Sequence, residues 1–206
     1  MKIVVLLGGE PYEGKIPADD AYVIGVDGGC DWAKGKVRFD ETLGDFDSAK
    51  TIPDPPPTKI YPSQKDETDG EIALTRALEL YRQFKADKIE LYGGGGGRED
   101  HFLGNLHLLY RAARAGARCE MINNRAKLLV FTGELCLENV KGKTLSLLPF
   151  GGDAHIIESE GLFYPANGLT LSYGTCRGVS NLGVDENARI VCGEGYLLAA
   201  INEEAQ

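Results

Sequence analysis

Two carboxylates separated by one residue, Asp45 and Asp47, follow a glycine in the stretch ETLGDFDSAK, residues 41–50. In an extended backbone, side chains two positions apart point to the same side and lie roughly 7 Å from each other. Like charges at that separation raise each other's pKa unless a cation lies between them. The pair is therefore a candidate for binding a divalent cation, although a solvated acidic turn capped by Asp47 or Ser48 has the same spacing.

A further carboxylate, Asp69, stands at the start of an expected helix in SQKDETDGEIAL, residues 63–74. Thr68 or Asp69 would serve well as the N-cap of that helix, and acidic residues are favourable in its first turn. Together with Asp45 and Asp47, Asp69 also supplies a third carboxylate for an oxygen-rich magnesium site of the kind that accompanies nucleotide phosphates.

A run of five glycines, residues 93–97, separates an expected strand from an expected helix. Glycine lets backbone N–H groups approach a phosphate closely, and a helix N-terminus favours anions, but a tight turn would use the same residues. The run is not a Walker loop, because Arg98 stands where that motif needs Lys; the arginine fork could hold two phosphate oxygens. Asp100 would repel such a ligand unless a metal or a proton-bearing substrate group lay between them, and His101 could cap the helix or take part in chemistry.

The elements that position these residues follow from hydrophobic patterning. Over residues 1–125, short apolar runs that end in Gly, Asp or Asn alternate with helical spacing of apolar residues over 69–84 and 100–115. Such runs suit strands buried on both faces of a parallel sheet, and the spacing suits amphipathic helices. The pattern predicts a doubly wound, mostly parallel α/β domain.

Ligands of such sheets bind outside the carboxyl ends of the strands. Three polar clusters come at those positions: VDGG with Asp27, Gly28 and Gly29, then GDFDS, then the glycine run. Their shared location favours one site over three unrelated turns.

The hydrophobic pattern of the sequence changes near residue 125. From residue 126 to 206, short alternating runs are separated by Gly, Asn and Asp, which predicts a small antiparallel β-sandwich. Earlier in the chain, residues 51–64 hold five of the nine prolines, so this segment is expected to be an exposed connection or flap.

Composition excludes several classes of protein. With 22 Lys plus Arg against 31 Asp plus Glu, the net charge of −9 argues against a nucleic-acid binder, and an anionic ligand would need a metal or backbone N–H groups. The five cysteines form no ligand-like spacing, which indicates reduced thiols in a cytoplasmic protein. The apolar run after Met1 is too short for a signal peptide, and no run has the roughly 18 apolar residues of a membrane span.

The motifs DGG, GDFDS, KDETDGEIAL and GGGGGREDHFLGNLHLL, in this order, resemble those of the thiamine pyrophosphokinase family. GLFYPANGLTLSYGTCRGVSNLG is similar to that family's Gly-x-x-Tyr and Ser-Asn segments. The resemblance implies Mg²⁺-dependent transfer of diphosphate from ATP to thiamine, giving thiamine diphosphate and AMP. It also implies a homodimer with active sites at the subunit interface, in which residues 1–125 form the nucleotide-binding catalytic domain and 126–206 contribute to thiamine binding and dimerisation.

The resemblance assigns residues to each part of this site. Magnesium would be held by Asp45, Asp47 and Asp69. ATP would be bound by Asp27, Gly28, Gly29, Lys65, Thr68, Gly95, Gly96, Gly97 and Arg98. Thiamine would contact Asp100, His101, Asn105, Ser180 and Asn181. The catalytic set would be the three metal carboxylates with Arg98 and Asp100.

Three departures from the family pattern leave questions open. Cys30-Asp31-Trp32 replaces the Ala-Asn of many relatives, which could reshape the adenine side, and Gly104 stands where Ala is usual. Leu182 rather than an aromatic follows the Ser-Asn pair, so the ring that stacks on the thiamine pyrimidine is not identified. Two alternatives remain: a diphosphokinase acting on another alcohol such as a hydroxymethylpterin, and a nucleotide-sensing module without turnover. The Ser180-Asn181 segment favours thiamine.

Overall fold

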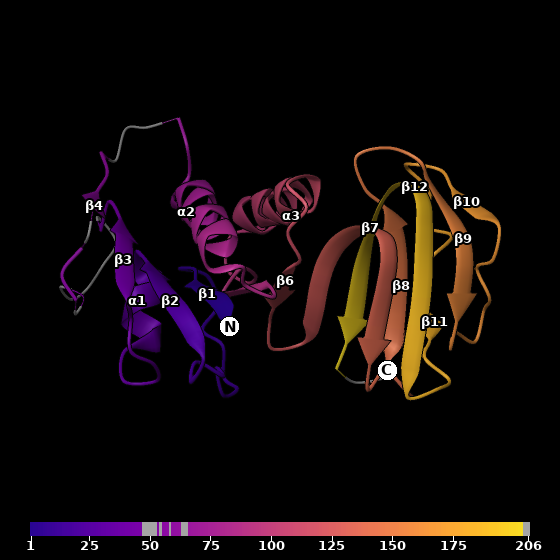
Figure 1. Ribbon diagram of the computed structural model, residues 1–206, viewed down its shortest axis with the longest axis horizontal. Coiled ribbons are helices and arrows are strands. Elements are labelled where there is room, and N and C mark those ends of the chain that lie inside the picture. Colours follow the sequence, from indigo (N-terminus) through magenta and orange to yellow (C-terminus); the bar gives the residue numbers. More distant parts are fainter. Residues whose placement is uncertain (47–52, 54, 58, 63–65, 204–206) are drawn as a thin grey trace. The chain divides into compact units, whose positions relative to one another are not determined.

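The computed structural model describes residues 1–46, 53, 55–57, 59–62 and 66–203. The chain divides into two compact units, Met1–Asn124 and Arg125–Gln206. Figure 1 shows helices and strands together in the first unit and strands in the second.

The first unit is built on a parallel sheet whose described strands lie in the order β6, β5, β1, β2, β3, β4. The chain proceeds outward from β1 to β4 and then returns to the other side of β1 to form β5 and β6. The point where the order reverses, between β1 and β5, is where doubly wound sheets bind ligands. The strands are β1 (Lys2–Leu6), β2 (Ala21–Val26), β3 (Glu41–Gly44), β4 (Lys59–Ile60), β5 (Ile89–Tyr92) and β6 (Cys119–Ile122).

Three helices accompany this sheet, α1 (Gly28–Ala33), α2 (Asp69–Phe84) and α3 (Glu99–Arg114). Figure 1 shows α2 and α3 on the same side of the sheet, and α1 packs against β1 through Cys30 and Ala33. Helix α2 has the predicted bounds because Thr68 forms a capping box with Glu71. In the described part of the chain, no helix is both long and apolar enough to cross a membrane.

A network of buried charges links β5 and β6. Glu90 and Glu120 are register partners whose side chains are only 4% and 2% exposed. Lys88 Nζ lies 2.7 Å from Glu90 and 3.1 Å from Glu120, while Lys2 binds Glu90 at 2.7 Å and Arg118 binds Glu120 at 2.7 Å. Each buried carboxylate is therefore paired with two cations, as burial of a charge requires.

Glu90→Gln is expected to destabilise the protein in a pH-dependent way. Burial opposes ionisation of Glu90, but hydrogen bonds from Lys2 and Lys88 outweigh it and lower the pKa of this carboxyl below 4.5. A lowered folded pKa contributes stability that is present above the unfolded pKa and is lost as pH falls through the folded pKa. We expect the variant to lose roughly 1–3 kcal/mol in free energy of unfolding at pH 7, measured by urea titration, and the loss to shrink below about pH 4.5.

The exposed Glu13→Gln is the matched control and should change the free energy of unfolding by less than about 0.5 kcal/mol. If Glu90→Gln lost the same free energy of unfolding at pH 7 and at pH 4, that result would contradict the lowered pKa of Glu90.

The second unit is an antiparallel β-sandwich, which confirms the predicted fold class. The first half of β12 pairs with β9 and its second half with β8, while β7 pairs along both halves. The two long strands are thus shared by both sheets. The strands are β7 (Ala126–Glu138), β8 (Thr144–Pro149), β9 (Ala154–Glu160), β10 (Leu169–Leu171), β11 (Asn181–Leu182) and β12 (Asn187–Asn202).

The two long strands differ from the expectation of short separate runs. KLLVF and GELCLEN form one strand, as do ARIVCG and GYLLAAI. The intervening glycines Gly133 and Gly195 adopt φ of 71° and 76°, and the register between the strands shifts between Cys192 and Leu197. Glycine at positive φ permits a bulge that bends a strand without ending it, so these glycines mark bends rather than turns.

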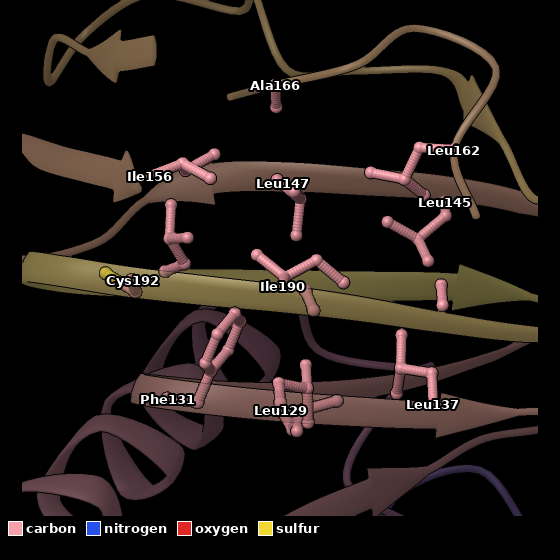
Figure 2. Packing of buried hydrophobic residues seen from close by; sticks show 14 of the residues in the cluster. Leu129, Phe131, Leu137, Leu145, Leu147, Ile156, Leu162, Ala166, Ile190 and Cys192 are labelled. Atoms are coloured by element: carbon pink, nitrogen blue, oxygen red, sulfur yellow. The ribbon is translucent and has the colours of Figure 1, made fainter. Parts of the chain in front are cut away.

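The core of this unit comes from alternating inward residues of the facing strands. Figure 2 shows Phe131 of β7, Ile190 of β12 and Leu147 of β8 within one buried cluster. Leu162 and Ala166, which lie in the segment between β9 and β10, complete it. This packing fixes the segment that carries the predicted Gly-x-x-Tyr motif.

Candidate active site

The predicted polar clusters lie along one edge of the parallel sheet. Asp45 follows β3, Asp27 follows β2, Gly8 and Gly9 follow β1, and Gly93 follows β5. These four strands are consecutive neighbours, so their carboxyl ends form a continuous row. Asp27 N–H donates to the carbonyl of residue 43 at 3.1 Å, which ties the end of β2 to the end of β3.

Close backbone contacts hold the loops after β1, β2 and β5 together. A Cβ atom at Gly29 would collide with the carbonyl of Leu6, and one at Gly93 with the carbonyl of Leu7. Gly9 N–H donates to Gly93 O at 2.9 Å. Only glycine permits this approach of one backbone to another, which explains why all three loops are rich in glycine.

The five-glycine run has a fixed half and an open half. Residues 93–95 are buried, and all three of their carbonyls accept hydrogen bonds: Gly93 O from Gly9 N–H at 2.9 Å, Gly94 O from Asn105 Nδ2 at 2.8 Å and Gly95 O from Glu10 N–H at 2.8 Å. Gly96 and Gly97 are exposed with φ of 72° and 75°, and nothing lies within 4 Å of a Cβ built on Gly97. A phosphate could therefore approach the backbone at Gly97, next to the start of α3.

Arg98 and Asp100 form an exposed ion pair at the start of α3. Arg98 Nε lies 3.1 Å from Asp100 Oδ1, and Nη2 lies 2.5 Å from Oδ2. The hydrogen bonds from Arg98 lower the pKa of Asp100 to about 2. His101 beside them is exposed. The arginine fork thus already holds two anionic oxygens, which is the geometry that would bind a phosphate.

The start of α2 lies beside the end of β1. A Cβ built on Gly70 would be 3.8 Å from Leu7 Cδ2 and 3.4 Å from Asn105 Oδ1, so α2, β1 and α3 meet here. Thr68 Oγ1 accepts a hydrogen bond from Glu71 N–H at 3.2 Å, and its hydroxyl proton is left to donate elsewhere. Asn105 therefore links the glycine run to the helix that carries Asp69.

The described residues supply enough ligands for a magnesium ion only if phosphate oxygens complete its coordination. No group of three His, Cys, Asp or Glu within the described ranges is placed to hold a metal ion, and Asp47 and Lys65 lie outside those ranges. Asp45 is partly buried, and one oxygen each of Asp27 and Asp69 is shielded from solvent. Mg²⁺ at nucleotide sites takes one or two carboxylates plus phosphate oxygens and water, and this donor set meets that requirement.

The predicted thiamine residues of the second unit lie in the segment leading into β11. Ser180 is exposed, with φ of 62°, and its N–H donates to Ser146 Oγ at 3.0 Å. Asn181 Oδ1 accepts from Tyr164 N–H at 2.9 Å, and Nδ2 donates to Tyr164 O at 2.7 Å. Ser180 is exposed, whereas the side-chain amide of Asn181 is hydrogen-bonded within the chain.

Trp32 links helix α1 to the end of β1, a contact that its position in the sequence did not predict. Its Nε1 donates to Leu7 O at 2.8 Å, a Cβ on Gly93 would lie 3.0 Å from its ring, and Lys36 Nζ lies 5.4 Å from the ring centroid. The sequence marked this position as a departure on the adenine side. The indole hydrogen bond to β1 could not be seen from spacing, although a single tryptophan just after DGG was the available signal.

Comparison with known proteins places the chain in a family. Residues 15–121 match the model described as thiamin pyrophosphokinase, catalytic domain, and residues 134–197 match thiamin pyrophosphokinase, vitamin B1 binding domain. Thiamine pyrophosphokinase of Bacillus subtilis is 31% identical over 166 residues, which cover 77% of this chain and 76% of that protein.

Solved structures agree with the sequence matches. The crystal structure of thiamine pyrophosphokinase from Bacillus subtilis has a TM-score of 0.84 and 28% identity, covering 98% of this chain and 99% of that one. The thiamin pyrophosphokinase structure from Geobacillus thermodenitrificans has a TM-score of 0.83 and 25% identity, covering 100% and 99%. The first family model alone spans more than half of the sequence. The chain therefore belongs to the thiamin pyrophosphokinase family, as its motifs predict.

Proposed function

We propose that this chain transfers the terminal diphosphate of ATP to the hydroxyl of thiamine, with Mg²⁺, giving thiamine diphosphate and AMP. The observation that carries the proposal is that a catalytic and a vitamin B1 binding model match successive stretches of the chain. The first of these stretches contains Asp27, Asp45, Asp69 and the glycine run at residues 93–97.

The nucleotide would lie along this row. A chain with a net charge of −9 needs local groups to attract phosphates, and the open backbone at Gly97, the start of α3 and the Arg98 fork supply them. Thr68 retains a hydroxyl proton to donate to a phosphate oxygen. The proposed ATP-binding residues are Asp27, Gly28, Gly29, Lys65, Thr68, Gly95, Gly96, Gly97 and Arg98.

Asp45, Asp47 and Asp69 would hold magnesium beside the phosphates. When bound, the ion would neutralise part of the phosphate charge, which is the main requirement of phosphoryl-type transfer. Arg98 would add a second positive group, so that the chain holds the phosphates by charge and position rather than by a covalent bond.

In the transfer, the thiamine hydroxyl oxygen bonds to the β-phosphorus of ATP while the bond from that phosphorus to the α–β bridging oxygen breaks. AMP leaves with the bridging oxygen and its electron pair, and the hydroxyl proton passes to a carboxylate, for which we propose Asp100. Paired with Arg98, Asp100 is a weak base because its pKa is about 2. Movement of Arg98 onto the phosphates would restore its basicity, so nucleotide binding would prepare the base.

The proposal includes a cytoplasmic homodimer with active sites at the subunit interface, as the family resemblance implies. Thiamine would contact Asp100, His101, Asn105, Ser180 and Asn181, and the second unit would take part in dimerisation. Sedimentation equilibrium of the purified chain tests the oligomeric state. A monomer with full activity would contradict the homodimer and its interfacial active sites.

The reaction is tested by incubating the purified chain with ATP, Mg²⁺ and thiamine and quantifying products by chromatography. We expect AMP and thiamine diphosphate in equal amounts, and neither product with excess EDTA. A parallel arm with a hydroxymethylpterin should give no transfer. AMP formation only with the pterin would assign another acceptor, and ATP binding without AMP release would overturn the proposal in favour of a nucleotide sensor.

A further inference from the structure

Strands β1 and β5 part just beyond their last paired residues, at the point where the strand order of the sheet reverses. Their register pairs Leu6 with Tyr92, and the next ladder hydrogen bond, from Leu7 N–H to Tyr92 O, is still made at 2.8 Å. A parallel ladder that continued would then bring Gly94 N–H to Leu7 O. Within residues 1–46 and 66–124, no hydrogen bond joins these two groups, so the ladder ends at Leu7.

Two side chains take the places of the ladder bonds that are not made. Trp32 Nε1 donates to Leu7 O at 2.8 Å, where the ladder would place Gly94 N–H. Asn105 Nδ2 donates to Gly94 O at 2.8 Å, where the ladder would place Gly9 N–H. The two buried carbonyls thus keep hydrogen-bond donors, and the glycine run is able to leave β1 at this point.

Helix α1 fixes the indole of Trp32 in this place. Gly29 and Trp32 are three positions apart and therefore share one face of the helix. A Cβ atom at Gly29 would collide with Leu6 O, so this face lies directly on the end of β1. Cys30 and Ala33 are buried in the core cluster beside it, and Trp32 packs against the same cluster. The position of the indole is therefore set by the packing of α1.

The ring of Trp32 also contacts the loops on either side of it. A Cβ built on Gly93 would lie 3.0 Å from Trp32 Cζ2, so the first residue of the glycine run packs against the ring. Lys36 Nζ lies 5.4 Å from the ring centroid, within the range of a cation–π contact, and donates to Tyr12 O at 2.7 Å. The loops after β1 and β5 are thereby both tied to one side chain.

We propose that Trp32 is a positioning residue for the nucleotide, whose indole holds the glycine run in the open arrangement that receives the phosphates of ATP. The inference rests on the proposed function for the identity of this ligand. A ring without the N–H would leave Leu7 O without its donor, and the register supplies Gly94 N–H as the replacement. The run would then be drawn toward β1, and its open half at Gly97 would move away from the arrangement that binds phosphate.

The test compares Trp32→Phe, which keeps a ring and removes the indole N–H, with Tyr22→Phe in the full chain. Tyr22→Phe is the matched control because it removes an aromatic donor, the hydroxyl 3.2 Å from Glu41 Oε2, near the amino end of β2. Calorimetric titration uses Mg²⁺ with α,β-methylene ATP, in which a methylene group replaces the bridging oxygen and blocks the transfer. Separate titration with thiamine gives a second Kd, and thermal unfolding sets a temperature at which every variant is folded.

A spectroscopic readout needs no mutation, because Trp32 is the only tryptophan of the chain. Fluorotryptophan incorporated during expression gives a single fluorine NMR resonance that reports on this side chain. We expect α,β-methylene ATP with Mg²⁺ to shift the resonance in a saturable way, with the Kd that calorimetry gives.

We expect Trp32→Phe to raise Kd for α,β-methylene ATP and KM for ATP about 10-fold, with Kd for thiamine within about threefold of the wild type. Tyr22→Phe should leave all of these constants within about twofold. A merely structural role of Trp32 would lower the melting temperature and leave both Kd values unchanged while the chain is folded.

Unchanged nucleotide constants for Trp32→Phe would overturn the inference, and so would an equal rise in Kd for thiamine. A fluorine resonance that stays in place when calorimetry shows saturation with the nucleotide would overturn it as well. Absence of nucleotide binding by the wild type would overturn both the inference and the proposed function. If the wild type binds α,β-methylene ATP but forms no thiamine diphosphate from ATP, while Trp32→Phe weakens that binding, the proposed function fails and the inference stands.

Discussion

The Asp45→Asn variant is expected to form AMP at least about 100-fold more slowly than the wild-type chain while remaining folded. Asp45 follows β3 directly, at the strand end whose neighbour carries Asp27. The amide keeps the shape of the side chain and removes the charge that a magnesium ion beside a triphosphate requires. The measurement is kcat for AMP release at saturating ATP and thiamine, with far-UV circular dichroism as the check on folding.

A matched change separates the loss of a metal ligand from a general loss of negative charge. Asp19→Asn removes one exposed carboxylate from the segment before β2, at the opposite edge of the sheet, and should leave kcat within about twofold of the wild type. Asp47→Asn, at a position outside the described residues, should act like Asp45→Asn. Near-normal turnover in both Asp45→Asn and Asp47→Asn would remove the metal assignment.

Magnesium dependence gives a second readout of the same assignment. The residual activity of Asp45→Asn should need more Mg²⁺ for half-saturation than the wild type, because one charged ligand is missing. An unchanged magnesium requirement together with a lowered kcat would place Asp45 in contact with the substrates instead.

Local patterns predicted α2, α3 and the buried strands β1, β2, β3, β5 and β6 of the first unit because local forces decide them there, but they did not predict α1, or β4 within the segment 51–64 that was expected to be an exposed connection. The helical spacing after residue 69 and the capping pair Thr68 and Glu71 lie within one stretch of sequence, and α2 has the predicted bounds. The buried strands are apolar runs without alternation, as expected for a sheet covered on both faces. In the second unit, Gly133 and Gly195 looked like turn residues but lie within bends, since only the pairing of distant strands decides whether a glycine ends or bends a strand.

The location of the candidate site could also be predicted, because parallel strands of known order must end at one edge. The hydrogen-bond partners of individual side chains could not be predicted. Asn181 bonds to Tyr164, 17 residues away, and Trp32 bonds to Leu7, 25 residues away. Motif likeness proposes Asn181 as a thiamine ligand, but it carries no information on the hydrogen bonds that this amide makes within the chain.

Arg98→Ala is expected to lower kcat/KM for ATP about 100-fold or more. In the free protein, the Arg98 fork holds Asp100 through two hydrogen bonds of 3.1 and 2.5 Å, and a phosphate offers the same pair of oxygens with more charge. Arg98→Lys should recover little of the loss, since an ammonium cannot make the bidentate contact. Arg114→Ala, an exposed arginine in the last turn of the same helix, is the matched control and should retain full activity.

Arg98 would have two roles: it would bind the phosphates, and it lowers the pKa of Asp100 in the free protein. The acid side of the pH profile distinguishes these roles. The pKa of Asp100 is about 2 while Arg98 is paired with it, and removing the arginine lets that pKa rise toward its usual value near 4. Because kcat/KM reports the free enzyme, the loss of kcat/KM on acidification should begin at higher pH in Arg98→Ala than in the wild type. Asp100→Asn should lower kcat with KM for ATP unchanged. If both variants retain kcat and KM for ATP within about threefold of the wild type, the pair has no part in the transfer, and the base must be sought among the carboxylates at the ends of β2 and β3.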